Sequence, residues 1–296
     1  MKAKYFVIPA IFLLMAACQK EEQFWEDNPD PTAEVSDSVF TLTVQASKGL
    51  DTKALWLDTS GSPDVLRAYW KNTEQVQVFH NGSFVGTLGV TPGAGEKPST
   101  ATLNGSISAP GLTEGDELLL MLPRQIWDYT GQAGTLASIE TTYDYATAAL
   151  EVSSISGSTV NTTKQVTFQN QQSVYRFSFT SGDPISVKGM TISSAGGNIV
   201  QSRTYEAGAW NNVLGNLTVT PASATTDPLY VSIFNKETSA DTYNFILTGS
   251  DDALYVASKP IPASVLDVPG KFISATDITA TQPDFGDAGG TTTTAL

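Results

Sequence analysis

The chain has 296 residues and a formal net charge of −14 at pH 7, from 30 Asp and Glu residues against 16 Lys and Arg residues. Because so acidic a protein repels the phosphate backbone, the composition argues against any nucleic-acid partner. Cys18 is the only cysteine and His80 the only histidine, which leaves no disulfide pair and no His/Cys cluster for zinc. We therefore expect a protein held together by core packing, without metal or cofactor.

Residues 1–17 are predicted to be a signal peptide. Two lysines precede an apolar run from Tyr5 to Leu14, which is too short to cross a bilayer as a helix. The small residues directly before Cys18 resemble the bacterial lipobox, in which the cysteine is lipidated (palmitate is one such lipid) and becomes the new N-terminus. An ordinary signal peptide with an incidental cysteine is the alternative. Residues 19–22 resemble the signal that exports Bacteroidetes lipoproteins, so we expect a surface-exposed protein anchored in the outer membrane through Cys18.

The segments that follow are predicted to be a polar tether and then many short strands. Residues 18–38 are polar and acidic, as in a flexible linker. In Phe40–Ala46 apolar and polar residues alternate, which is typical of a half-buried strand. Further predicted strands are Val76–Phe79, Ala101–Ile107, Glu117–Leu122, Val166–Phe168, Val174–Phe179, Ile185–Ile192, Leu217–Val219, Leu229–Phe234, Tyr243–Leu247, Leu254–Ala257 and Phe272–Ile278. No window sustains a helical period, so the sequence predicts an all-β fold of the sandwich type.

The strand-rich region is expected to form two tandem β-sandwich domains. A small polar stretch, Val152–Thr159, separates two strand-rich halves. We predict an N-terminal domain over residues 39–155 and a C-terminal domain over residues 164–281, each of ordinary domain size. Residues 282–296 are rich in Gly, Asp and Thr and are expected to form a mobile tail.

Three segments, taken in their order behind the lipobox and the tether, resemble the fimbrillins, the pilin subunits of Bacteroidetes type V pili. They are Phe40–Ala46 followed by Lys53-Ala54, Trp70–Phe79, and Val166–Phe179. Together they touch both halves of the chain. The resemblance implies two transthyretin-like β-sandwich domains, a structural or adhesive role in a fimbrium, and no enzymatic activity.

The resemblance also implies assembly with other pilin subunits by donor-strand exchange. A surface protease would cut at Lys53-Ala54, with Lys48-Gly49 as the second choice. The first strand would then leave the groove that Phe40, Leu42 and Val44 had filled, and a strand from another subunit would occupy it. We expect this first strand at the edge or end of a sheet, because removing an interior strand would unravel the domain.

Two departures from the family pattern affect the predicted role. The family's processing site is best known with arginine, so the lysine here predicts that an arginine-specific protease fails. A stalk pilin also needs a C-terminal strand to donate, whereas Thr291–Leu296 offers little apolar surface and Phe272–Ile278 resembles an ordinary domain strand. An accessory subunit at the tip or the anchor therefore fits better than a stalk subunit, with a host or bacterial surface molecule as its ligand.

Two other functions stay open. A carbohydrate-binding lipoprotein of a glycan-uptake system would use exposed aromatic residues, although core packing is their default role. The candidates are Trp70, Trp127, Tyr129, Tyr143, Tyr145 and Trp210. A glycoside hydrolase would need two carboxylates that meet only in space. We expect His80 to be an exposed turn residue, and Asp251-Asp252 to be a solvated hairpin turn rather than a calcium loop.

Overall fold

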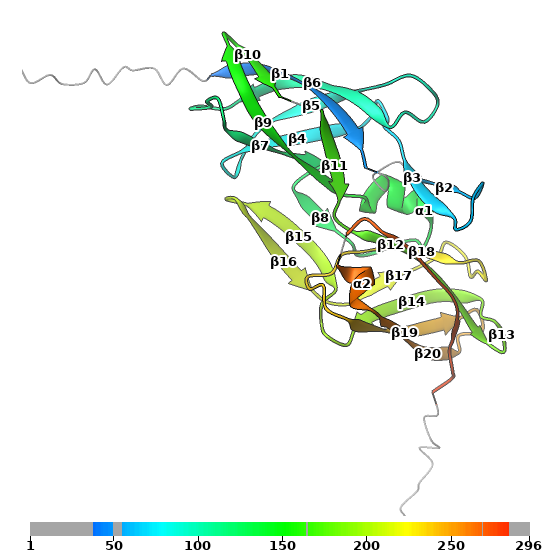
Figure 1. The fold of residues 1–296 in the computed structure, drawn as a ribbon. Helices are drawn as coiled ribbons and strands as arrows, with labels where there is room; N and C mark the ends of the chain where they lie inside the picture. The colour runs from blue at the N-terminus through cyan, green and yellow to red at the C-terminus, as the bar shows by residue number, and fades with distance from the viewer. Residues whose placement is uncertain (1–37, 50–54, 164, 268, 284–296) are drawn as a thin grey trace, which may run out of the picture. The chain divides into compact units, whose positions relative to one another are not determined.

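The computed structural model describes residues 38–49, 55–163, 165–267 and 269–283, and these residues belong to one compact unit within Ser36–Leu296. The predicted all-β fold is confirmed (Figure 1). In the described ranges the helical segments are only α1 (Leu136–Ser138), η1 (Ile139–Tyr143) and α2 (Ala263–Leu266). None of them has the length and apolar character that crossing a membrane requires.

Eight strands from residues 39–170 form one sheet, which closes into a barrel. Their order is β10-β1-β11-β9-β7-β4-β5-β6, and β6 pairs in turn with β1. The strands are β1 (Val39–Lys48), β4 (Gln75–His80), β5 (Ser83–Pro92), β6 (Thr100–Ser108), β7 (Glu117–Leu122), β9 (Ala146–Ser156), β10 (Thr159–Thr162) and β11 (Val166–Asn170). A short hairpin of β2 (Leu55–Asp58) and β3 (Val65–Ala68) lies outside this sheet.

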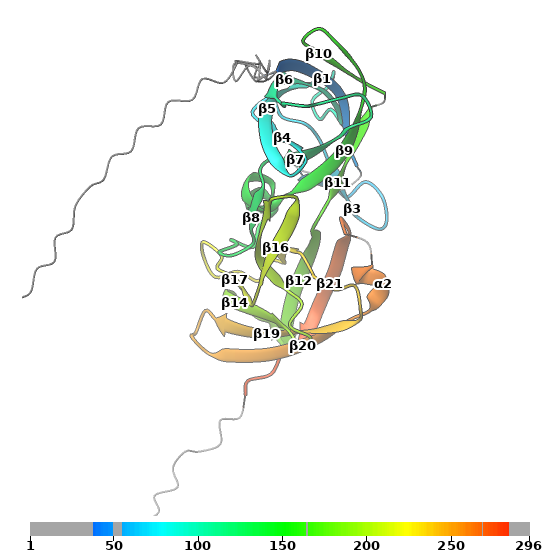
Figure 2. The same ribbon diagram turned by 90° about the vertical axis from the view of Figure 1, so that its left-hand side faces the viewer.

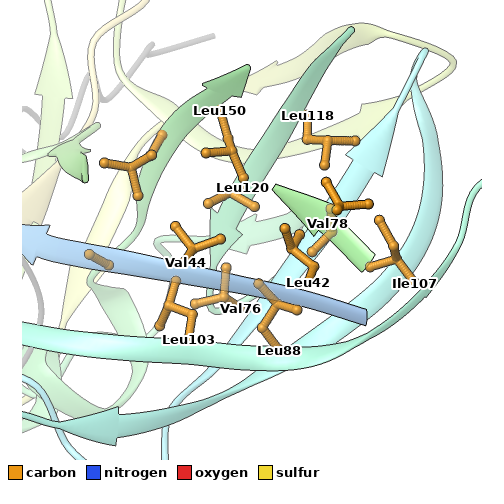
Figure 3. Packing of buried hydrophobic residues seen from close by; sticks show 14 of the residues in the cluster. Leu42, Val44, Val76, Val78, Leu88, Leu103, Ile107, Leu118, Leu120 and Leu150 are labelled. Atoms are coloured by element: carbon orange, nitrogen blue, oxygen red, sulfur yellow. The ribbon is translucent and has the colours of Figure 1, made fainter. Parts of the chain in front are cut away.

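The interior of the barrel is a single apolar core built from alternate residues of its strands (Figure 3). The predicted central strand Glu117–Leu122 is β7, which pairs with β4 on one side and β9 on the other. Other strands contribute Val76, Leu88, Leu103 and Leu150, all less than 4% exposed. Because the side chains of a strand alternate between its two faces, this one set fills the inside of the closed sheet.

Two further four-stranded sheets enclose a second core between them (Figure 2). One contains β12 (Ser173–Ser181), β13 (Asp183–Pro184), β18 (Leu229–Ile233) and β21 (Phe272–Thr279), and the other contains β14 (Val187–Ser194), β17 (Leu217–Val219), β19 (Asp241–Gly249) and β20 (Leu254–Ile261). Phe177 on β12 meets Phe245 on β19 with ring centroids 5.0 Å apart. Contact between rings of opposite sheets is typical of a β-sandwich.

Three segments depart from the predicted domain division. Val152–Thr159 is not a linker, because it contains the turn between the paired strands β9 and β10. Val166–Phe168, expected to open the second domain, lies in β11 and pairs with β1, and the end of β11 pairs with β9. β8 (Ile126–Asp128) lies within the predicted N-terminal domain but pairs with β15 (Val200–Glu206) of the predicted C-terminal domain. β15 in turn pairs with β16 (Ala209–Leu214). A two-domain organisation remains our proposal, with the main boundary at the β11–β12 connection and with β8 contributed to the second domain.

Candidate functional site

The candidate site is strand β1 together with the strands that flank it. On one side β1 pairs antiparallel with β6 along nine residues, from Val39 opposite Ser108 to Ser47 opposite Thr100. On the other side it runs parallel to β10 and then to β11. The expectation that β1 lies at a sheet edge or end is therefore wrong. A strand can be predicted from its alternation, but its neighbours cannot, and here they lie far along the chain.

The inward side chains of β1 fill the barrel core as the alternation predicts. Leu42, Val44 and Ala46 are fully buried and Phe40 is 8% exposed. Figure 3 shows Leu42 and Val44 pointing from β1 into the cluster of side chains from the surrounding strands. The outward residue Thr43 instead accepts a hydrogen bond from Asn104 Nδ2 at 2.6 Å, across the pair with β6.

Removal of β1 would take away a large share of the stability of the barrel. Full burial of a Phe, Leu or Val side chain contributes about 1.5–3 kcal/mol, so the three larger inward residues account for roughly 5–9 kcal/mol. A domain of this size is usually stable by only about 5–15 kcal/mol. The main-chain N–H and C=O groups of β6, β10 and β11 that now bond to β1 would also lose their partners. A barrel without β1 would therefore lose most of its stability and expose two unpaired strand edges.

The last inward residue of β1 is a buried cation, Lys48. Its side chain is fully buried, and Nζ lies 2.8 and 2.9 Å from the carboxylate oxygens of Glu74. Nζ also donates to the carbonyl oxygen of Tyr69 at 2.6 Å and lies 4.5 Å from the centre of the Trp70 ring. Glu74 was not among the predicted site residues. The alternation did contain a signal, because it places Lys48 on the buried face, where a charge requires a partner.

The structure describes only one of the predicted processing and lipidation sites, Lys48-Gly49. Cys18, Lys53 and Ala54 lie outside the described residues. Lys48-Gly49, the second choice for cleavage, ends β1, and the Lys48 side chain that a protease would recognise is enclosed by Glu74 and Trp70. In the folded chain this bond is therefore a poor substrate.

Two turn predictions meet different outcomes. The expectation that His80 is exposed is wrong: it is 6% exposed, and its Nε2 lies 3.1 Å from a carboxylate oxygen of Asp116. It ends β4 rather than standing at the tip of the hairpin. Asp251-Asp252 lies in the β19–β20 turn, where Asp252 is exposed and pairs with Lys188. Within the described ranges no group of three or more His, Cys, Asp or Glu side chains could hold a metal ion.

The aromatic residues considered for glycan stacking lie mainly in cores. Trp127, Tyr129 and Tyr145 are fully buried, and Trp70 is 2% exposed. Trp127 stacks on Tyr145 at 5.3 Å between ring centroids. Burial raises the pKa of Tyr129 and, to a smaller degree, that of Tyr145, because the ionised phenol would be desolvated. These four rings cannot form an exposed sugar platform without rearrangement of the cores.

Arg203 joins this aromatic cluster without a carboxylate among its described contacts. Its guanidinium carbon lies 3.9 Å from the centre of the Trp210 ring and 4.4 Å from that of Phe234. Burial lowers its pKa to about 10, since the charged form is desolvated. The ring faces attract the guanidinium electrostatically and offset part of the cost of its burial. The cluster therefore has a packing role, and Trp210 is engaged in it.

The last predicted strand, Phe272–Ile278, is confirmed as an ordinary strand of the sandwich. It lies in β21, which runs parallel to β12 and buries Ala275 and Ile278. Donation of this strand to another subunit would open the second core. The tail segment Thr291–Leu296 lies outside the described residues.

No protein-family model matches the sequence, and no curated protein matches it. Among solved structures, the chain is similar to a candidate cell adhesion protein from Bacteroides uniformis, with 10% identity, a TM-score of 0.44, and coverage of 83% of this chain and 98% of the other. A fimbrial assembly protein from Parabacteroides distasonis matches with 10% identity, a TM-score of 0.35, and coverage of 80% and 90%. The C-terminally truncated tip fimbrial protein Mfa3 from Porphyromonas gingivalis matches with 10% identity, a TM-score of 0.36, and coverage of 75% and 81%.

These three proteins are named as adhesion or fimbrial proteins. At identities near 10% and TM-scores below 0.5, they do not establish a function for this chain.

Proposed function

We propose that the protein is a non-enzymatic surface subunit of the fimbrillin type, which acts in fimbrial assembly or adhesion by accepting a strand in place of β1. The observation that carries the proposal is that β1 closes the barrel alone, with main-chain pairing on both sides and alternate side chains in the core. A segment held in this way can be exchanged for another extended segment with the same alternation.

The point of cleavage in the proposed mechanism is Lys53-Ala54. This bond lies between the end of β1 at Lys48 and the start of β2 at Leu55. A cut there separates all of β1 from the rest of the chain without interrupting another described strand. Cleavage at Lys48-Gly49 would require Lys48 to leave its contacts with Glu74 first, so we place the processing site at Lys53.

The proposed location is the outer surface of the outer membrane. Lipid on Cys18 would hold the precursor there, and cleavage after Lys53 would release the barrel from that anchor. The accessory role, at the tip or the anchor rather than in the stalk, is supported by the integration of β21 into the sandwich. The glycan-binding alternative has less support, because its aromatic candidates lie mostly in cores.

The test uses the full chain with a recognition sequence for a site-specific protease inserted between residues 52 and 53. After the cut, a fluorescently labelled peptide of residues 39–48 should enter the nicked protein as the resident β1 leaves, and nicked molecules kept without peptide should associate. The uncut chain under the same conditions is the control. A nicked protein that retains β1 indefinitely, or that loses β1 and stays monomeric and stable, would contradict the proposal.

A second test identifies the mature form. N-terminal sequencing of the protein recovered from its own cells should find a chain that begins at Ala54. A lipid-blocked Cys18 as the only form would show that β1 is retained and that the protein is an anchored lipoprotein.

A further inference from the structure

We propose that Glu74 selects the incoming strand by its charge: the strand that replaces β1 must carry a lysine or arginine at the position of Lys48. This inference rests on the strand-accepting function proposed above and specifies the chemistry of the partner. The pattern required of the partner is four apolar residues at alternate positions, followed two residues later by a cation, as in Phe40, Leu42, Val44, Ala46 and Lys48 of β1.

The site that receives the cation is built by the part of the chain that remains after cleavage. The side chain of Glu74 is 5% exposed, and its Oε2 also accepts a hydrogen bond from the main-chain N–H of Lys71 at 2.9 Å. The carbonyl oxygen of Tyr69 and the face of Trp70 complete the surroundings of Lys48 Nζ. A carboxylate, a carbonyl oxygen and an aromatic face together form a site for an ammonium or guanidinium group.

Departure of β1 would leave this carboxylate without its ammonium partner, and a strand that takes the place of β1 would bury it again. A buried ion pair contributes little to stability relative to two apolar residues at the same positions. Removal of only one partner costs much more stability, because the other charge stays buried and unpaired. An incoming strand with an apolar residue at this position would desolvate Glu74 without supplying a cation to pair with it. Glu74 therefore mainly weakens the binding of strands that lack the cation. Unfavourable contacts with wrong partners are a common source of specificity.

The neighbouring cations already have other partners. The ammonium of Lys71 forms an ion pair with Glu140. The guanidinium of Arg124, which lines the same pocket as Glu74, donates from Nε to the carbonyl oxygen of Ile126. Neither side chain has a hydrogen bond to the Glu74 carboxylate in the structure. The compensating charge must therefore come from the strand that enters.

The rest of this chain does not supply such a strand. Downstream of β1, no Lys or Arg is preceded by apolar residues at all four alternate positions. Four cations are preceded by apolar residues at three of the four positions, and in each case a polar residue occupies the other: Arg124 with Asp116, Lys236 with Ser232, Lys259 with Asp251 and Lys271 with Asp267. The segments before them contribute to β7, β18, β20 and α2 of the fold. The partner we infer is a different protein with the β1 pattern, rather than a later segment of a second copy.

The experiment is a competition on the nicked full chain described above, with labelled peptide 39–48 bound. Three unlabelled peptides compete: the native sequence, a Lys48→Met peptide, and a peptide that carries both Ser47→Lys and Lys48→Ser. The last has the same composition and charge as the native peptide but directs its cation toward solvent. The same series is measured in Glu74→Gln, with Glu117→Gln on the exposed face of β7 as the matched control for net charge.

In the native protein and in Glu117→Gln, we expect both altered peptides to compete at least about 100-fold less well than the native peptide, as for loss of one partner of a buried pair. In Glu74→Gln, the preference for the native peptide over Lys48→Met should fall below about fivefold. The preference is a ratio between peptides measured on the same protein variant. A general loss of stability in Glu74→Gln therefore does not by itself change this ratio.

Two results would overturn the inference in distinguishable ways. If all three peptides displace the label equally well, or if Glu74→Gln keeps the full preference, strand exchange stands and charge selection by Glu74 is wrong. If no peptide enters the nicked protein, the strand-accepting function is wrong, and the inference is wrong with it.

Discussion

The buried pair of Lys48 and Glu74 gives a prediction for the intact, uncut chain. Replacement of either partner alone leaves a charge in the barrel wall, where both side chains are nearly inaccessible to water. Lys48→Met leaves the carboxylate with the main-chain N–H of Lys71, and Glu74→Met leaves the ammonium with the Tyr69 carbonyl and the Trp70 ring. Each single substitution should lower the free energy of unfolding by about 3–5 kcal/mol.

The double variant separates this explanation from a simple loss of packing. If the cost comes from the unpaired charge, Lys48→Met with Glu74→Met should be closer to the native stability than either single variant. The exposed pair of Lys188 and Asp252 is the matched control, and Lys188→Met should cost less than about 1 kcal/mol.

The assay is urea unfolding followed by tryptophan fluorescence and by circular dichroism. With a urea dependence of about 1–3 kcal/mol per molar, each single variant should shift the midpoint down by about 1–5 M. The reasoning is refuted if the singles cost less than about 1 kcal/mol, or if the costs of the two singles add in the double variant.

Three further predictions concern other parts of the fold. Leu42→Ala should lower the free energy of unfolding by about 2–5 kcal/mol in urea titrations, while the outward Thr43→Ala costs less than about 1 kcal/mol; equal costs would contradict the assignment of faces. Burial raises the pKa of Tyr175 to about 12, so this residue should lower the stability by up to about 2.7 kcal/mol as the pH rises from 10 to 12, and the total fall should be smaller by that share in Tyr175→Phe. In calorimetry Gly82→Ala should reduce the melting temperature more than Gly157→Ala. Both glycines have a positive φ, but only a Cβ at Gly82 would overlap the backbone of the β15–β16 hairpin. Similar reductions of the melting temperature in the two variants would contradict this contact.

Much of the fold could be predicted from local patterns. Glu117–Leu122 and Leu217–Val219 are strands with the predicted bounds, and the inward face of β1 agrees with its alternation. These features depend on the side chains of one segment, which the sequence displays directly. The sequence pattern does not predict strand β5, because Gly86 and Gly89 interrupt the alternation of apolar residues in it. At Gly86 the glycine is required, since a Cβ there would meet the carbonyl oxygen of Ser106 on β6 at 2.5 Å.

The neighbours of each strand could not be predicted in the same way. Thr43 bonds to Asn104 across 61 residues, and Ser47 to Thr167 across 120 residues. Alternation states which face of a strand is buried but not which strand lies beside it. For that reason the local pattern predicts neither the interior position of β1, nor the sheet that contains β11, nor the partner of Lys48.

The closure of the barrel by β1 also bears on how a strand-accepting subunit survives before assembly. An open sheet edge with unpaired N–H and C=O groups attracts other strands without discrimination. With β1 in place, β6 and the β10–β11 side are both paired, so the first sheet presents neither of these edges to other chains. The strand that must leave in the proposed mechanism is thus the one that prevents premature association. Cleavage before the replacement strand is at hand would expose two edges and an apolar core together. We therefore expect β1 to protect the subunit until a replacement strand is at hand, and its loss without a replacement to lead to association of nicked molecules.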